Sequence, residues 1–373
     1  AAGGAGSASA TGGSGSASTS GSATGSGVTG GVTAATSSGA GASAGGVEIM
    51  NFAATPPTRT NARITATISP FWERGGASSV SKTPVIAPAW WAGSASVAPP
   101  VACRPESLPV TDIKHLIRDP YAIYAKRILD LKRLDSLTKS PDAPLRGTVI
   151  HDLLEAFLQT GPWTNAEAAK ATLLALAEER LQATVPWPAA RRMWLARVVR
   201  FSEWFVTQEI VRQAQIVSTK TEIKGEIDLP ELNFTLRGTA DRIDLLNDGT
   251  AHIYDYKTGK PPTRAQQLHF DKQLLLEVEI LRRGGFPGLG SLKVTGATYI
   301  GLDNAPTELP APIDEADVWS DFSKLIRAYQ SAEQGYAARR AMLKAEESSD
   351  YDHLARYGEW STNQRATIIK VSK

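Results

Sequence analysis

The sequence predicts an α/β fold in which a mixed sheet is flanked by helices. From residue 216 the apolar positions recur every second residue, and turn-forming residues divide the region up to residue 257 into consecutive strands. Helical patterns precede this region at residues 146–213 and follow it at residues 263–283. A further apolar run at residues 293–302 predicts one more strand. Strands bracketed by helices are typical of an α/β core, here with an added N-terminal helical part.

The first 104 residues have a composition of their own. Residues 1–47 carry no charge and are almost wholly Gly, Ala, Ser and Thr, so we expect them to be disordered. They lack the basic start and the apolar core of a signal peptide. Because Met50 is the first methionine, we interpret this segment as a linker, an artificial leader or mistranslated upstream sequence. Residues 48–104 are rich in Pro, Ala and Ser and predict an irregular linker.

Charge and cysteine content limit the possible partners. The net charge is +2, so the chain lacks overall basic character and any DNA-binding surface must be local. The single cysteine, Cys103, excludes an internal disulfide and fits a reducing cytoplasm. No apolar run is long enough to span a membrane. Candidate cations for a local surface, or for solvated helix faces, are Lys126, Arg127, Lys132, Arg133, Arg146, Arg191, Arg192, Arg197 and Arg200.

Helical periodicity and capping residues define the region before the sheet. Five helices are predicted, at residues 111–116, 121–131, 146–159, 164–182 and 188–213. Asp119-Pro120 separates the first two, and Thr164 with Glu167 forms a capping-box pattern. The last helix has an apolar side that we assign to the core: Trp194, Val198, Phe201 and Phe205.

The two strands around residue 248 carry a dense set of charged residues. Gly238-Thr-Ala-Asp241-Arg-Ile-Asp244 and Asp255-Tyr-Lys257-Thr-Gly259 flank the turn Asn247-Asp248-Gly249, which predicts a hairpin. Asp255 and Lys257 are two residues apart and share a strand face. Two carboxylates with a lysine suit a hard cation and phosphodiester hydrolysis. The alternative is a charged surface hairpin. Asp244 is interpreted as structural, paired with Arg242 or a nearby basic group.

Further polar residues lie upstream and downstream of this hairpin. His151 and Glu155 are four apart on one helix and share a face. Glu222 lies on a preceding strand, and Gln273 lies on the helix that follows. A single helical histidine is most often only partly buried and hydrogen-bonded. Glu155 either orients His151 or faces solvent.

The order of these motifs resembles the RecB-type nucleases of the PD-(D/E)XK superfamily. Arg118-Asp-Pro-Tyr-Ala-Ile-Tyr-Ala125 and Arg146-Gly-Thr-Val-Ile-His151 are similar to the nuclease domain of the AddB family. The resemblance covers roughly residues 104–340. It implies a restriction-endonuclease-like nuclease domain at residues 105–345, which leaves a polar C-terminal tail at residues 346–373.

The resemblance also implies roles for individual residues. Metal ligands would be His151, Asp241, Asp255 and the backbone carbonyl of Tyr256, with Mg²⁺ as the ion and Mn²⁺ accepted. Lys257 would position the attacking water and stabilise developing charge. Glu222, with Glu226 as the alternative, would assist the site, and Gln273 would support it or contact the DNA backbone. Relatives have Gln-x-x-x-Tyr here, whereas this chain has Glu277 in the tyrosine position.

Cofactors and partners follow from the same resemblance. In many relatives a cysteine before the Pro-Tyr pair joins three later cysteines on an iron–sulfur cluster. Asp119 stands at that position and no cysteine follows Cys103, so we expect no iron–sulfur cluster. The resemblance implies double-strand break repair, with single-stranded DNA supplied by an AddA-type helicase–nuclease subunit. The alternatives are a stand-alone RecB-like exonuclease and a non-catalytic DNA-binding or complex-stabilising module.

Overall fold

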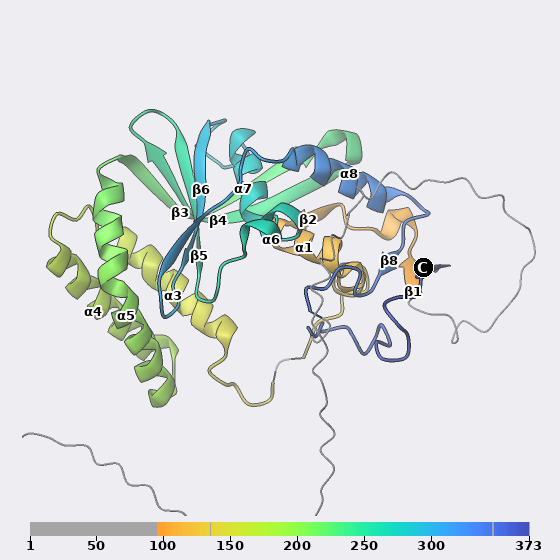
Figure 1. Ribbon diagram of the computed structural model, residues 1–373, viewed down its shortest axis with the longest axis horizontal. Coiled ribbons are helices and arrows are strands. Elements are labelled where there is room, and N and C mark those ends of the chain that lie inside the picture. The colour runs from red at the N-terminus through yellow and green to blue at the C-terminus, as the bar shows by residue number, and fades with distance from the viewer. Residues whose placement is uncertain (1–94, 135, 345–346, 373) are drawn as a thin grey trace, which may run out of the picture. The chain divides into compact units, whose positions relative to one another are not determined.

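A mixed six-stranded sheet is the main sheet of the described residues (Figure 1). The computed structural model describes residues 95–134, 136–344 and 347–372, which belong to a unit spanning Lys82–Lys373. The expectations for residues 1–47 and 48–94 lie outside the described residues. The predicted fold class is confirmed, since helices flank the sheet on both faces.

The sheet is organised around one long strand. Its members are β2 (Ser107–Pro109), β3 (Ile216–Leu229), β4 (Phe234–Leu246), β5 (Ala251–Lys257), β6 (Val294–Gly301) and β7 (Thr307–Pro310). Strand β4 joins the two strands predicted at residues 233–238 and 241–246. It pairs antiparallel with β3 along its length, parallel with β2 at its start and antiparallel with β5 at its end. Strand β6 runs parallel to β5, and β7 is antiparallel to β6. The turn between β4 and β5 is confirmed, with Gly249 at φ +76°.

Two sets of helices cover the two faces of the sheet. Helices α1 (Val110–Arg118), α7 (Gln273–Arg282) and α8 (Val318–Gln330) pack on one face and enclose the larger hydrophobic core. Helices α3 (Ala143–Leu158), α4 (Ala166–Thr184) and α5 (Pro188–Gln213) pack together over β5 and β6 (Figure 1). The predicted apolar side of α5 is buried there. Among the described residues, no helix has the length and apolar character needed to cross a membrane.

Several predicted helix limits are wrong at the level of local chemistry. Asn165, rather than Thr164, caps α4, because its side chain accepts a hydrogen bond from the Ala168 N–H. The second predicted helix divides into α2 (Pro120–Ile123) and a π-helical turn, Tyr124–Ile128. The helix predicted at residues 263–283 is broken, since α6 (Arg264–His269) ends before α7 begins. Short 3₁₀ turns occupy Val101–Cys103 and Pro230–Leu232.

Both ends of the described chain contribute to a small second sheet. Strand β1 (Ala95–Ala98) pairs parallel with β9 (Thr367–Lys370) and antiparallel with β8 (Tyr336–Ala337). Residues 95–98, which were predicted to lie in an irregular linker, therefore form a paired strand, and the predicted polar C-terminal tail contains another. Backbone pairing overrides the weak local signals of segments this short.

Asp119 fastens the C-terminal segment to the first helices. One carboxylate oxygen of Asp119 accepts a hydrogen bond from the Arg339 N–H at 2.9 Å, and the other accepts from the Ser349 hydroxyl at 2.6 Å. Arg339 in turn pairs with Asp352 at 3.0 Å. Asp119 therefore joins the first helices to the segment that carries Arg339 and Ser349 by hydrogen bonds.

Candidate metal centre and active site

Three predicted site residues from three different elements meet at one point. His151 lies on α3, Glu222 on β3 and Asp241 on β4. One nitrogen or carboxylate oxygen from each lies within 4.8 Å of the others. Glu222 is exposed and the other two are partly buried, so the cluster opens to solvent. Imidazole nitrogen and carboxylate oxygen together suit Mg²⁺, Mn²⁺ and similar divalent ions, so these residues fit the implied metal.

A reversal of the strand pleat explains how Glu222 and Asp241 come together. Thr221 contacts Glu155 of α3, whereas Ile223 packs into the core beneath α7. Residues two apart normally share a strand face, so the pleat changes sides between Thr221 and Ile223. Glu222 permits the change by adopting φ +47°, a left-handed conformation that costs a non-glycine residue roughly 1–3 kcal/mol. Such strain is typical of functional positions.

The partner strand changes sides at the matching position. Thr221 pairs with Arg242 and Ile223 pairs with Ala240, which leaves Glu222 and Asp241 between the two pairs. Ala240 lies in the same core as Ile223, whereas Arg242 contacts α5 on the other face. The double reversal brings both carboxylates toward His151.

The peptide group of Tyr256 holds the histidine and the aspartate in place. Its N–H donates to Asp241 Oδ2 at 2.8 Å, and its carbonyl lies 2.9 Å from His151 Nε2. Because a carbonyl can only accept, Nε2 donates this hydrogen bond and Nδ1 faces Asp241 Oδ2 at 3.5 Å. The predicted ligand carbonyl thus orients the imidazole, while Nδ1 points at the carboxylate cluster.

Electrostatics within the cluster favour a bound cation. Burial acts to lower the pKa of His151, but the hydrogen bond and charge of Asp241 outweigh it and raise the pKa. The pKa of Glu222 is raised by partial burial and then by the charge of Asp241, with Glu155 and Asp152 adding to the effect. Crowded carboxylates repel one another, and a divalent ion relieves that repulsion.

Asp255 and Lys257 lie beside the cluster rather than within it. The two side chains share a strand face, as predicted, and Lys257 Nζ lies 2.6 Å from Asp255 Oδ2. Gln273 Nε2 donates to Asp255 Oδ1 at 2.7 Å, and Lys257 Nζ donates to Gln273 Oε1 at 3.3 Å. Asp255 is only 1% exposed, and its burial raises its pKa against the opposing charge of Lys257. Burial acts to lower the pKa of Lys257, but the charge and hydrogen bond of Asp255 outweigh it and raise the pKa, so the lysine stays an ammonium ion.

Glu277 lies four residues after Gln273 on α7 and is fully buried. Its Oε1 accepts from Gln273 Nε2 at 3.2 Å, while the buried Oε2 has no hydrogen-bond partner among the described residues. Burial raises the pKa of Glu277 well above its ordinary value, and the charge of Asp255 raises it further. Glu277 therefore holds the Gln273 side chain in position by a hydrogen bond and has no exposed surface with which to contact DNA.

A buried ion cluster fixes the strand that carries Asp241. Arg242 is 0% exposed and donates to both carboxylate oxygens of Glu209, at 2.6 and 2.8 Å. Its Nε donates to Asp244 at 2.8 Å, which confirms the predicted structural pairing of Asp244. Glu209 lies on α5 and has no sequence motif, so pattern reasoning missed it.

Other candidates fall outside the cluster. Glu155 accepts hydrogen bonds from the Thr221 hydroxyl and the Gln159 amide instead of forming one with His151 among the described residues. Glu226 lies on the outer part of β3, opposite Arg237, and is not in the cluster. Among the candidate cations, Lys126 and Arg127 both form ion pairs with the buried Asp112, so both side chains are already engaged within the protein.

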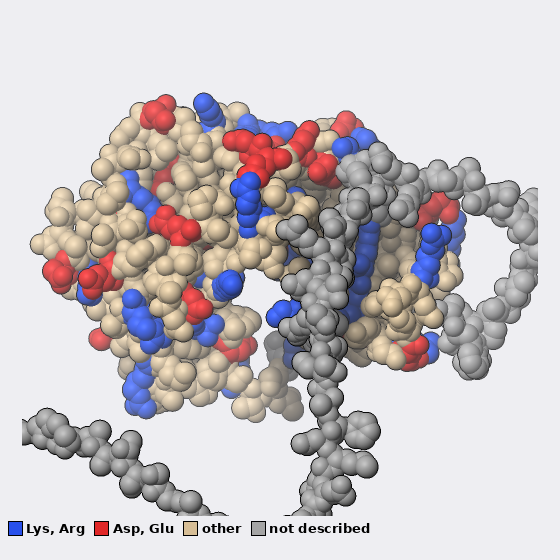
Figure 2. Space-filling model, viewed as in Figure 1, with Lys and Arg blue, Asp and Glu red and all other residues tan. Residues whose placement is uncertain are grey.

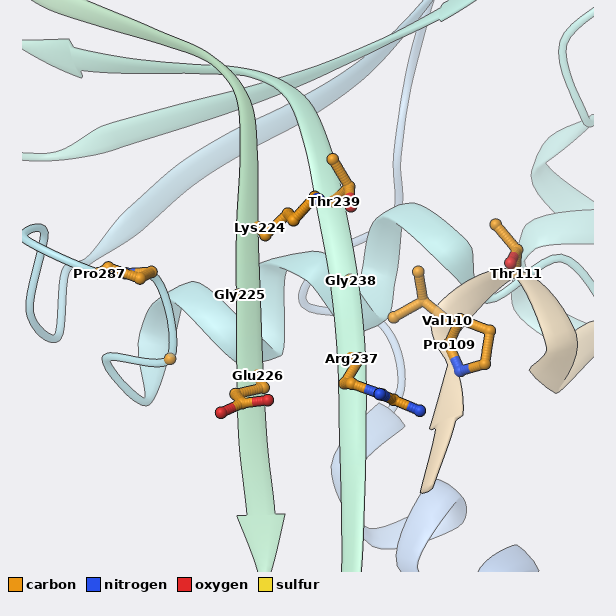
Figure 3. A pocket seen from close by; sticks show the side chains of 11 residues that line it. Pro109, Val110, Thr111, Lys224, Gly225, Glu226, Arg237, Gly238, Thr239 and Pro287 are labelled. Atoms are coloured by element: carbon orange, nitrogen blue, oxygen red, sulfur yellow. The ribbon is translucent and has the colours of Figure 1, made fainter. Parts of the chain in front are cut away.

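A shallow pocket of about 530 Å³ lies on the outer part of the β3–β4 pair (Figure 3). Lys224 and Thr239 line it, two residues from Glu222 and Asp241 respectively, and α7 passes behind the two strands. Acidic and basic side chains are interspersed over the face shown in Figure 2, in keeping with the small net charge.

One family model and several known proteins match this chain. A family model described as the PD-(D/E)XK nuclease superfamily matches residues 107–364. An uncharacterized protein of Rickettsia bellii is 32% identical over 185 residues, and one of Rickettsia typhi is 32% identical over 189 residues. Each match covers 49% of this chain, which spans only 22% of the length of those relatives.

A solved structure, described as the crystal structure of SSO0001, is similar to this chain at 15% sequence identity and a TM-score of 0.26. The match covers 60% of this chain and 76% of the SSO0001 chain. A score this low carries no argument about the fold. The family match covers well over half of the residues, and the protein therefore belongs to the PD-(D/E)XK nuclease superfamily.

Proposed function

We propose that the protein is a Mg²⁺-dependent deoxyribonuclease that hydrolyses phosphodiester bonds of single-stranded DNA. The observation that carries the proposal is the meeting of His151, Glu222 and Asp241 within 4.8 Å, beside the ion pair of the buried Asp255 with Lys257. A non-catalytic DNA-binding module would have no need to maintain a strained glutamate and a partly buried lysine at one point.

The residues divide the work between holding a cation and handling the phosphate. A divalent ion held by His151, Glu222 and Asp241, with Asp255 at its side, would activate water and neutralise charge on the phosphate. The raised pKa of Lys257 keeps it positive, so it cannot accept a proton from water. Its role is to orient the attacking water and to stabilise the charge that develops on the phosphate oxygens. Gln273 bonds to both Asp255 and Lys257 and keeps their geometry.

The finer assignment rests on the motif resemblance. We propose an AddB-type nuclease domain that acts in double-strand break repair, in the cytoplasm, with an AddA-type helicase–nuclease subunit that delivers the single strand. The chain spans 22% of the length of its curated relatives, which is in keeping with one domain of a larger protein. A stand-alone RecB-like exonuclease is the competing form of the same chemistry.

The test is cleavage of end-labelled single-stranded DNA by the chain of residues 1–373 with Mg²⁺, with Mn²⁺ and with EDTA. Lys257→Ala should reduce cleavage by roughly 10²–10³-fold, the effect of removing one preorganised charge donor, and should leave Mn²⁺ binding intact. Asp255→Ala should lose cleavage and also bind Mn²⁺ more weakly. Lys260→Ala is the matched control, because Lys260 is exposed and three residues further along. Cleavage that persists in EDTA, or equally in Lys257→Ala, would refute the proposal.

A further inference from the structure

Two arginines lie near a single carboxylate at the edge of the candidate active site. Arg197 of α5 forms an ion pair with Asp303, which follows β6. Arg146 of α3 lies close enough to Arg197 and Asp303 for both charges to shift its pKa. It makes no hydrogen bond or ion pair with any described residue. The Nε atoms of both arginines are buried without a hydrogen-bond partner among the described residues. Two positive charges thus face one negative charge.

This arrangement is unfavourable unless an anion joins it. Burial lowers the pKa of Arg146, and the charge of Arg197 lowers it further, while Asp303 opposes both. Buried arginine donors without partners cost free energy, and neighbouring guanidinium groups repel one another. Guanidinium groups bind phosphate oxygens in a two-pronged geometry that would satisfy the free donors.

The pair lies at the same end of the sheet as Lys257. The Leu302 N–H donates to the Lys257 carbonyl at 2.8 Å, and Asp303 is the next residue. On the other side, a Cβ at Gly147 would lie 3.8 Å from the hydroxyl of Thr258, which directly follows Lys257. Arg146 precedes His151 by five residues on α3, or roughly 7.5 Å along the helix axis at about 1.5 Å per residue.

We infer that Arg146 and Arg197 form a phosphate-binding site. It holds a phosphate of the cleaved DNA strand that is adjacent to the phosphate at which the strand is cut. The inference rests on the proposed function, because it names the part of the substrate that this end of the site grips. Arg146 supplies the free guanidinium, and Asp303 keeps Arg197 in position beside it. The anion completes a charge balance that the protein alone leaves open.

The test is binding of a fluorescent oligothymidylate to the full chain in EDTA, so that cleavage cannot interfere. Arg146→Gln should bind about tenfold more weakly at moderate salt, the effect of losing a charge-assisted hydrogen bond. A plot of log affinity against log salt should become shallower by about 0.7, the value for one lost single-strand phosphate contact. Arg146→Lys should restore part of the affinity. Arg200→Gln is the matched control, since Arg200 is exposed on α5 three residues after Arg197.

Thermal unfolding separates binding from structure. Arg146→Gln should melt at or above the temperature of the parent, because it removes a repulsion, whereas a merely structural arginine would lower the melting temperature. Parent-like affinity and salt slope in Arg146→Gln, or an equal loss in Arg200→Gln, would overturn the inference. A third outcome would also overturn it: inorganic phosphate raises the melting temperature of the parent but not of Arg146→Gln, while the two proteins bind DNA with equal affinity. The site would then bind a free anion rather than DNA. If the parent still cleaves DNA, these outcomes leave the proposed function standing.

Discussion

Neutralising Glu209 should destabilise the protein strongly, although this residue lies outside the metal cluster. Glu209→Gln keeps the side-chain volume and removes the charge that Arg242 meets with two hydrogen bonds. Arg242 is 0% exposed, and only Asp244 would remain to balance it. Breaking a buried ion pair by removing one partner costs about 3–5 kcal/mol.

The expected shift can be measured by thermal unfolding followed by circular dichroism. A loss of about 1 kcal/mol lowers Tm by roughly 2–4 °C in a domain of this size, so a fall of about 6–20 °C is expected. Glu203→Gln is the matched control on the same helix, because the Glu203 side chain is 81% exposed and its ion pair contributes little. A Glu209→Gln protein that melts within about 2 °C of the parent would refute the view that this ion cluster anchors β4.

Three further outcomes follow from other parts of the structure. Burial lowers the pKa of His252 to about 4, with the charges of Arg212 and Arg242 adding to the effect. The unfolded chain therefore binds more protons between pH 6.5 and 4, and stability should fall by up to about 3 kcal/mol as pH drops through this window. Thermal melts of His252→Gln against pH should show a flatter decline; an unchanged decline would contradict the assignment. Asp119→Ala removes the acceptor for the C-terminal segment and should speed limited proteolysis near residue 345, unlike the exposed control Asp130→Ala. Adding an AddA-type helicase should raise cleavage several-fold, whereas equal activity without it would favour the stand-alone exonuclease.

Local pattern was sufficient for the elements that the site requires. The turn at Asn247-Asp248-Gly249 placed β4 and β5 correctly, and the two-residue spacing of Asp255 and Lys257 put both on one face. His151 was a weak candidate by itself, because most helical histidines are only hydrogen-bonded. The motif Arg146-Gly-Thr-Val-Ile-His151, rather than helical periodicity, predicted that His151 is a metal ligand.

Features set by distant contacts could not be read from the chain. Glu209 and Arg242 are 33 residues apart and belong to no shared motif. The left-handed conformation of Glu222 reverses the pleat in a strand whose sequence alternates without interruption. Strand β1 was missed because four residues give little periodicity, and its partner β9 comes from the far end of the chain.

The central claim is that His151, Glu222 and Asp241 hold one divalent cation. Calorimetric titration of Mn²⁺ into the parent and into Asp241→Asn tests it most directly, because the substitution preserves shape and removes one charge from the cluster. The account predicts saturable binding by the parent and at least roughly tenfold weaker binding by Asp241→Asn, with the melting temperature little changed. Equal Mn²⁺ affinity in the two proteins, or no saturable binding by the parent, would contradict it.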